Sequence, residues 1–338
     1  MGSEIVIIPG MLSRVADSLF WIGRLIDRAE NIARLADAAR RIEALPGEGP
    51  EPNTEWRSTL ISAGLRDSDL VDLDEVSRDF AVHTLFFERQ NPSSIYNCIT
   101  NARENARAVR SDLTQDVWET LNHGWRTYRD MEEWEHDRSA LAKLIDWMKG
   151  FSAQFRGALN GTMLRNDGYY FMRLGQAVER IDSMARLIDV KYHVLLPRAD
   201  DVGSPSDRTQ WQALLYAASA QKAYNFATKS DLSAQGVADF LVLSHQFPRS
   251  IRFNVNFLYQ TLRQLEQHYD QRSDCHDLVA DFAWRINGQS IEQVIAGGLH
   301  EFLTETVEQN YAVADALSVS YGFGAPAVSS VDKDDHGQ

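Results

Sequence analysis

The sequence predicts an all-α protein, a multi-helix bundle built from two tandem repeats related by a pseudo-twofold axis. Apolar residues recur at helical spacing along most of the chain, and the alternating pattern of strands is nearly absent. One segment also occurs twice, because Gly23–Asp37 (GRLIDRAENIARLAD) aligns with Gly175–Asp189 (GQAVERIDSMARLID) at an offset of 152 residues. Six of the fifteen aligned positions are identical, which indicates an internal duplication.

Three further landmarks support the duplication, because they follow in the same order at offsets of 155 to 156 residues. They pair Trp56 with Trp211, Phe86-Phe87 with Val242-Leu243, and Asn91–Ile95 with Phe247–Ile251. The expected domains are a first repeat with its connecting helices at 11–162 and a second repeat at 163–323. Residues 1–10 are expected to be a leader or an added remnant, and residues 324–338 a disordered tail.

Start and stop signals define the expected helices in chain order. Ser13 caps the first helix, which the Pro- and Gly-rich loop after Pro46 ends. Asn91-Pro92 is typical of an N-cap followed by proline at the first helical position. Asp167 caps the long helix that opens the second half, and Pro197 stops it. The predicted helices are Ser13–Glu43, Thr54–Leu65, Asp74–Phe87, Pro92–Ser111, Thr114–Tyr128, Ser139–Leu159, Asp167–Leu196, Arg208–Phe226, Ser233–Ser244, Pro248–Tyr269, Cys275–Ile286 and Ser290–Ser320.

The composition excludes several classes of protein. Lys and Arg number 34 against 48 Asp and Glu, and a net charge of −14 argues against a nucleic-acid partner. The two cysteines, Cys98 and Cys275, have no CxxC spacing, which favours a reducing compartment without disulfides. Since no apolar run approaches the ~18 residues of a membrane span, no membrane segment is expected and the predicted location is the cytoplasm.

Each copy of the repeated segment carries a charged stripe along one helix face. The first stripe holds Gly23, Asp27, Glu30, Arg34 and Asp37, and the second holds Gly175, Glu179, Asp182, Arg186 and Asp189. Both stripes border the apolar face that must form the core. Glycine inside a helix costs about 1 kcal/mol relative to alanine, so Gly23 and Gly175 indicate the close approach of another backbone or a ligand.

Two interpretations of the stripes remain open. In the structural one, Glu30 with Arg34 and Asp182 with Arg186 form i, i+4 salt bridges, each worth a few tenths of a kcal/mol. In the functional one, the stripes line a polar pocket between the halves, since partly buried charges need partners and often mark sites. The recurrence of the same signs on the same face gives the second interpretation the same weight as the first.

A second candidate is the segment Asn101–Arg110, which places arginines on one helix face with an acidic neighbour. Its residues are Arg103, Arg107 and Arg110, with Glu104 beside them, and the related helix of the second half carries Arg249, Arg252 and Arg263. Arginine forks suit phosphate or carboxylate groups, although a solvated face is the more common explanation of either cluster alone.

Other motifs are weaker. Glu133 and His136 form one Glu-x-x-His, whereas a di-iron bundle needs two on different helices. Glycine-rich phosphate loops, nucleophile elbows and zinc-ligand spacings are not found in the sequence. No metal and no cofactor are therefore predicted, and no catalytic residue can be named.

The opening run resembles that of the alpha-E domain family, an all-helical domain that carries a Glu-Arg motif and occurs in tandem. The residues that carry the resemblance are Met11–Arg24 (MLSRVADSLFWIGR), Asp27–Asn31 (DRAEN), Ala102–Arg107 (ARENAR) and Pro248-Arg249-Ser250. It extends from Met11 to about Phe323. The second copy holds the motif as Glu179-Arg180, whereas the first departs from it with Asp27-Arg28.

The resemblance implies a context rather than a reaction. Such proteins are associated with circularly permuted ATP-grasp ligases and transglutaminase-like proteins, in a system that makes or modifies peptide or amide bonds. The chain is expected to bind the ligase or a peptide-like or amino-acid substrate. Carboxylates or phosphates would be held by Arg28, Arg180, Arg103 and Arg107. Amines would be held by Asp27, Glu30, Glu179 and Asp182. The flanking candidates are Arg34, Arg186, Glu104, Arg249 and Ser250. Two alternatives remain: an enzyme that uses paired carboxylates as acid and base, and a structural dimerisation module.

Overall fold

The computed structural model describes residues 13–44, 54–65, 76–131, 140–194, 205–228 and 231–323, and every regular element within these ranges is helical. This confirms the predicted all-α class. The elements are α1 Ser13–Glu43, α2 Thr54–Ser62, α3 Arg78–Val82, the π-helix η2 His83–Phe87, α4 Ile95–Ala108, the 3-10 helix η3 Arg110–Asp112, α5 Gln115–Asp130, α6 Leu141–Thr162, α7 Asp167–Val194, α8 Pro205–Ala217, α9 Gln221–Thr228, α10 Ala234–Leu243, α11 Ile251–Tyr269, α12 Asp274–Asn287, α13 Ile291–Gly297 and α14 Leu299–Ser320. The expected leader, the expected tail and the Glu133–His136 motif lie outside the described residues.

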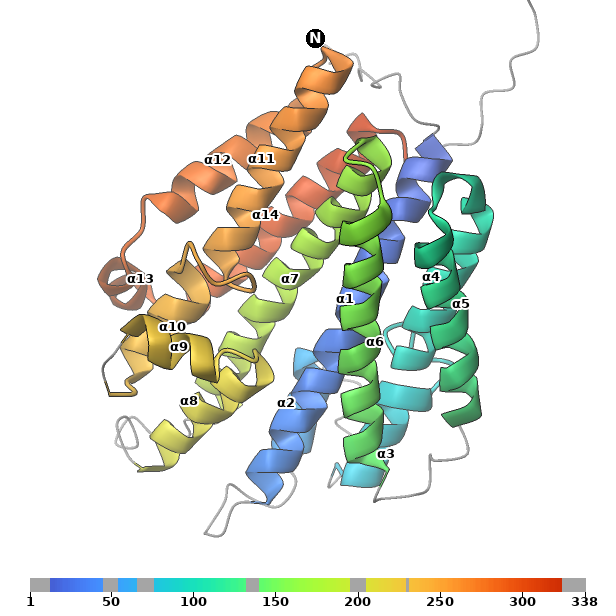
Figure 1. Ribbon diagram of the computed structural model, residues 1–338. Coiled ribbons are helices and arrows are strands. Elements are labelled where there is room, and N and C mark those ends of the chain that lie inside the picture. Colours follow the sequence, from blue (N-terminus) through green and yellow to red (C-terminus); the bar gives the residue numbers. More distant parts are fainter. Residues whose placement is uncertain are drawn as a thin grey trace, which may run out of the picture.

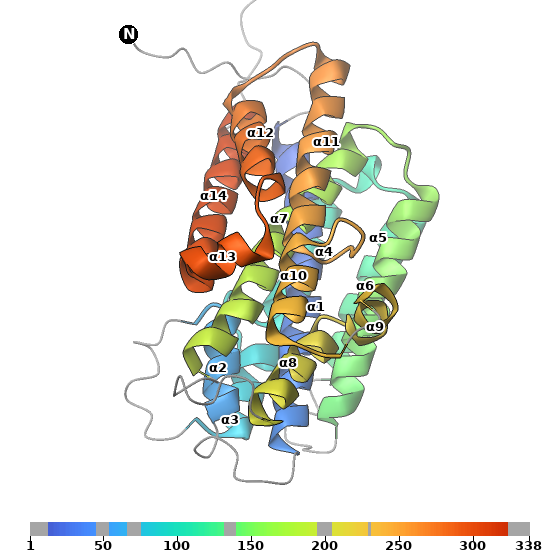
Figure 2. The same ribbon diagram turned by 90° about the vertical axis from the view of Figure 1, so that its left-hand side faces the viewer.

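The long helices α1 and α7 lie side by side at the centre of the molecule (Figure 1). Helices α4 and α6 pack on α1 and are joined by α5, whereas α11 and α14 pack on α7 and are joined by α12. Helices α2, α3 and α8 lie at the end where α1 and α7 finish (Figures 1 and 2). Each central helix thus has an equivalent set of neighbours, as a duplication predicts, and superposition of the halves by a twofold rotation stays a prediction.

Gly23 and Gly175 lie where α1 and α7 touch. A Cβ atom on Gly23 would lie 2.1 Å from the backbone oxygen of Met172, and one on Gly175 would lie 2.0 Å from that of Phe20. The close backbone approach predicted from these glycines is confirmed. Gly23 meets Met172 and Gly175 meets Phe20, so the contact is reciprocal. Further along both helices Arg28 meets Glu179, so α1 and α7 run in the same direction.

Two predicted helices are each broken in two. The helix expected at Arg208–Phe226 is divided into α8 and α9 at Ser219, whose φ of 52° is left-handed. The helix expected at Ser290–Ser320 is divided into α13 and α14 at Gly298, whose φ is 97°. An α-helix cannot continue through a positive φ, and glycine is the residue that adopts it most readily.

The predicted N-cap at Asn91 is also wrong, because α4 begins three residues later. Ser94 is the N-cap and its Oγ accepts the backbone N–H of Asn97. The Asn91 side chain instead fixes the preceding turn, where its Oδ1 accepts the N–H of Ser93. Ser250 caps α11 in the same way, with the N–H of Phe253 as donor.

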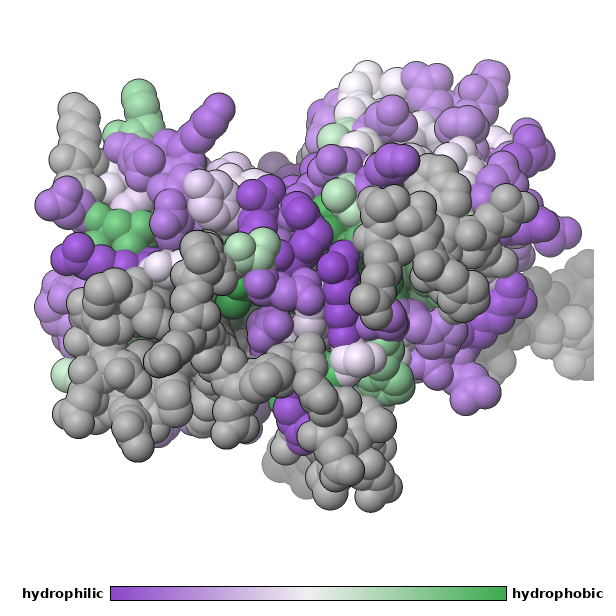
Figure 3. Space-filling view, turned by 90° about the horizontal axis from the view of Figure 1, so that it is seen from below, coloured by the Kyte–Doolittle hydropathy of each residue, from purple (hydrophilic) through white to green (hydrophobic). Residues whose placement is uncertain are grey.

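The described helices bury one continuous apolar core, to which the inward faces of both central helices contribute Leu19, Ile22, Ile26, Val178 and Ile181. None of these helices is both long and apolar enough to cross a membrane. Seen from the end that holds α2, α3 and α8, hydrophilic side chains occupy much of the visible surface between the grey residues (Figure 3). Both cysteines are buried and unbonded to each other.

Candidate functional site

The predicted Glu-Arg motifs pair with each other across the two central helices. Arg28 of α1 donates two hydrogen bonds to Glu179 of α7, from Nε to Oε1 at 2.7 Å and from Nη2 to Oε2 at 2.9 Å. In return Arg180 of α7 holds Asp27 of α1, with Nε 3.0 Å from Oδ2 and Nη2 3.1 Å from Oδ1. Arg24 adds a third bond to Glu179 at 3.2 Å. The acidic residue of each motif is thus bound by the arginine of the other.

Glu30 lies at the centre of a cluster of charged side chains, which we call the Glu30 cluster. Its side chain is 0% exposed. Its carboxylate accepts hydrogen bonds from Arg34 on α1, Ser152 and Arg156 on α6, and Arg249 just before α11. The Ser152 Oγ and the Arg249 Nη2 are each 2.6 Å from a carboxylate oxygen. A single carboxylate therefore joins both halves of the molecule.

The Glu30 cluster carries an excess of positive charge. Around Asp27 and Glu30 lie four guanidinium groups, those of Arg34, Arg156, Arg180 and Arg249. Burial by itself would raise the pKa of Glu30, but Arg249, Arg34 and Arg156 hold that pKa well below its usual range. Burial lowers the pKa of Arg249 to about 10 in spite of Glu30. Glu30 is therefore an ionised, structural partner rather than a proton donor near neutral pH.

These lowered pKa values make the fold sensitive to acid. Burial raises the pKa of Glu179, yet Arg28 and Arg24 hold it below its usual value, as the arginines do for Glu30. A carboxyl group whose pKa is lower in the folded than in the unfolded chain stabilises the fold. This stabilisation is complete above the pKa of the unfolded chain, near 4.3, and is lost as the pH falls below that value. We expect the contribution of these two carboxyl groups to the free energy of unfolding to be constant from pH 7 to 5.5 and to fall steeply below pH 4.5.

Urea unfolding followed by circular dichroism at several pH values measures this dependence. The Glu179→Gln variant is the control, because it has one fewer lowered carboxyl pKa and should show a shallower fall. An equal slope for the variant and the native sequence between pH 5 and 3 would contradict the assignment.

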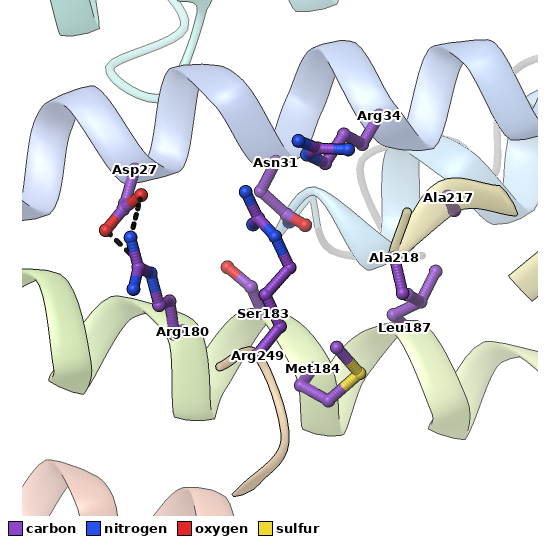
Figure 4. A pocket seen from close by; sticks show the side chains of 10 residues that line it. All are labelled: Asp27, Asn31, Arg34, Arg180, Ser183, Met184, Leu187, Ala217, Ala218 and Arg249. Atoms are coloured by element: carbon purple, nitrogen blue, oxygen red, sulfur yellow. Dashed lines mark hydrogen bonds and ion pairs between the residues drawn. The ribbon is translucent and has the colours of Figure 1, made fainter. Parts of the chain in front are cut away.

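A small pocket of about 20 Å³ remains beside the Glu30 cluster, which is room for about one water molecule. Figure 4 shows Asp27 and Arg180 facing each other between the central helices, while Arg249 reaches in from the segment before α11. Asn31 of α1 and Ser183 of α7 also line it. The arginines fill this side of the interface almost completely.

A larger cavity of about 210 Å³ lies beside the other motif pair. We call it the Asp182 cavity. Its polar lining includes Arg28, Asn31, Ser93, Glu179, Asp182, Ser183, Arg186 and Tyr311. The Asp182 Oδ2 accepts a bond of 2.9 Å from Arg186, whose Nη2 also bonds the Tyr311 hydroxyl. The Asp182 Oδ1 is buried and accepts no hydrogen bond from the described residues.

Other predicted site residues lie elsewhere or have structural contacts. Arg103 packs over the Trp125 ring at 4.2 Å and bonds Asn122, so it joins α4 to α5. Glu104 pairs with Arg103 and Arg107, and the Arg107 side chain is 69% exposed. The structure therefore does not bring these residues together with the stripes. Ser250 is an N-cap, whereas its neighbour Arg249 belongs to the Glu30 cluster.

Sequence reasoning missed Ser152, Arg156, Ser219 and Tyr311. Ser152 and Arg156 lie four residues apart on α6, and their only signal in the sequence is this i, i+4 spacing. The Ser219 hydroxyl accepts a hydrogen bond from Arg34, and Tyr311 bonds Arg186 from α14. Ser152, Arg156 and Tyr311 belong to helices, and Ser219 to the break between α8 and α9, that only tertiary folding brings against α1 and α7.

The chemistry open to this arrangement is recognition by charge. Because Glu30 and Glu179 are paired and have lowered pKa values, neither is suited to donate or accept a proton near neutral pH. This weighs against the acid–base interpretation of those two carboxylates. No group of three or more His, Cys, Asp or Glu side chains that could hold a metal ion occurs within the described ranges.

Comparison with known proteins gives a family and distant relatives. Residues 11–321 match Alpha-E, described as a predicted alpha-helical domain with a conserved ER motif. Uncharacterised proteins of Mycobacterium bovis and of two strains of Mycobacterium tuberculosis are 23% identical over 334 residues, which cover 91% of this chain. The matched region is 36% of the length of each relative, so the chain spans about a third of them. No solved structure matches the chain.

Proposed function

The chain belongs to the Alpha-E family, and from this premise we propose that it is a binding component of an ATP-grasp-associated system that makes or modifies peptide or amide bonds. In this role it binds a peptide-like substrate, the ligase, or both, and the ligase carries out the chemistry. A transglutaminase-like protein is a further partner. The reaction uses ATP, so we place the protein in the cytoplasm.

The observation that carries the proposal is the Asp182 cavity beside the paired Glu-Arg motifs. Guanidinium groups bind carboxylates and carboxylates bind amines, and those are the two groups that an amide ligase joins. The cavity is lined by both halves of the molecule, from Arg28 and Ser93 to Asp182 and Tyr311. The relatives are longer than the matched region, as is expected when this domain acts together with further domains.

At the Glu30 cluster, the contacts favour a structural role over a binding role. All the polar atoms of the Glu30 carboxylate are satisfied by its neighbours, and nothing larger than a water molecule fits beside it. We assign the Glu30 cluster to holding the halves together and the Asp182 cavity to recognition.

Mixing the purified chain with the ATP-grasp ligase of the same organism tests the proposed function. We expect co-elution in size-exclusion chromatography at micromolar concentration and faster amide-bond formation when the chain is present. The Asp182→Asn variant should co-elute as the native sequence does yet stimulate less, because it retains the fold and the outer surface. Separate elution together with an unchanged rate of product formation would refute the proposal.

A further inference from the structure

We propose that the Asp182 cavity is a binding site for a small zwitterion, a free α-amino acid or a compound with the same ammonium and carboxylate groups. This deepens the proposed function, on which it rests for the role of the bound molecule. The binding itself belongs to the isolated chain and needs no ligase.

The first argument is the unused acceptor. Asp182 is 8% exposed, and its Oδ1 is a buried carboxylate oxygen with no hydrogen-bond donor among the described residues. A buried, unpaired carboxylate oxygen is costly, so a donor from outside the protein is expected there. An ammonium group supplies both the hydrogen bond and the opposite charge.

The second argument is the contrast with Glu30, which lies at the corresponding position of the first stripe. The four groups that bond the Glu30 carboxylate come from α1, α6 and the segment before α11. Asp182 has the equivalent of one of them, because Arg186 bonds it as Arg34 bonds Glu30. Tyr311 of α14 lies beside this pair, and the Asp182 Oδ1 has no hydrogen-bond donor among the described residues.

One difference between the two sides lies just before the N-caps of α4 and α11. Ser94 and Ser250 are the N-caps of α4 and α11, so the residues just before them, Ser93 and Arg249, occupy corresponding positions. The Arg249 guanidinium donates a hydrogen bond to Glu30, whereas Ser93 lines the Asp182 cavity. The cavity measures about 210 Å³ on the side of Ser93, against about 20 Å³ on the side of Arg249.

Size and charge then select the ligand. A dry cavity of about 150 Å³ admits benzene, so 210 Å³ admits a molecule of amino-acid size. Arg28 and Arg186 line the cavity. Within the described part of the chain each uses two of its three guanidinium nitrogens in hydrogen bonds, Arg28 to Glu179 and Arg186 to Asp182 and Tyr311. The remaining N–H groups suit a carboxylate. Among the charged side chains that line the cavity, the two arginines balance Glu179 and Asp182, which favours a ligand of no net charge over a phosphate.

Thermal unfolding of the dialysed chain with a panel of free amino acids tests the inference. Each amino acid is compared with its N-acetyl derivative, which lacks the ammonium group, and with its amide, which lacks the carboxylate. We expect at least one free amino acid to raise the melting temperature in a saturable way, and isothermal titration calorimetry to give one site. Its two blocked derivatives should have little effect.

Two variants locate the site. Asp182→Asn should weaken binding about tenfold or more, because it removes the charge that faces the ammonium group. Ser93→Arg should abolish binding and raise the melting temperature of the free chain, because the new guanidinium takes the place that Arg249 has on the other side. Asp116→Asn, the same chemical change at an exposed position on α5, should bind as the native sequence does.

The outcomes separate the two proposals. If no free amino acid in the panel binds, or if Ser93→Arg binds as tightly as the native sequence, the zwitterion site is wrong. If amino acids bind but the ligase neither co-elutes nor responds, the site stands and the proposed function fails. If the ligase responds equally to the native chain and to Ser93→Arg, the proposed function stands without this site.

Discussion

Gly23→Ala is expected to destabilise the fold by about 3 kcal/mol or more, a large effect for the addition of one methyl group. The new Cβ would lie 2.1 Å from the Met172 backbone oxygen and 3.2 Å from the Gln176 backbone nitrogen. Both atoms belong to a helix, so they cannot move aside as a flexible side chain could. The central helices must separate, and the paired motifs between them must lengthen their bonds.

A matched control is available on α6. An added Cβ on Gly157 would meet nothing within 4 Å, so Gly157→Ala should stabilise the chain by about 0.5–1 kcal/mol through helix propensity alone. Urea unfolding followed by circular dichroism measures both variants. Gly175→Ala should behave as Gly23→Ala does, and the double variant should cost less than the sum, because a single separation of the helices relieves both clashes. Equal stability of Gly23→Ala and Gly157→Ala would show that α1 and α7 do not touch there.

Glu30→Gln is expected to cost about 3–5 kcal/mol, because it leaves three buried or half-buried guanidinium groups without their shared carboxylate. The amide has nearly the same shape, so the loss reports charge rather than packing. Glu104→Gln provides the comparison, since Glu104 is 50% exposed and pairs only with its neighbours on α4. That change should cost no more than about 1 kcal/mol, as is typical of exposed pairs.

Removing one of the surplus charges should restore part of the loss. Arg249→Met in the Glu30→Gln background keeps an apolar stem but removes a guanidinium that no longer has a partner. The double variant should therefore be more stable than Glu30→Gln alone, a coupling that a double-mutant cycle of unfolding free energies measures. A loss below 1 kcal/mol for Glu30→Gln would mean that the pair is only a surface ladder.

The repeated segment allowed the centre of this fold to be predicted from sequence. Two copies of one stripe, each with a glycine, indicated two equivalent helices that approach closely, and Gly23 and Gly175 meet backbone as that pattern requires. The pattern also placed Asp27, Glu30, Glu179 and Asp182 on faces that border the core, and the structure buries all four.

The rest depended on contacts that no local pattern specifies. Arg156 and Tyr311 belong to α6 and α14, and nothing in those helices indicates which charge they will meet. The face that carries Arg103 and Arg107 looked like the stripes, yet it packs on α5 and faces solvent. Helix periodicity also continued through Ser219, where a left-handed residue breaks the helix.

The parallel contact of α1 with α7 has a consequence for how the chain is made. Corresponding positions of the two helices are 152 residues apart in sequence, so α1 leaves the ribosome long before the helix that covers its glycine exists. At about 5–20 residues per second this interval is roughly 8–30 s. Until then Asp27 and Glu30 stay hydrated, and the first half cannot reach its final packing. Folding of the centre is therefore a late event that waits for the second half of the chain.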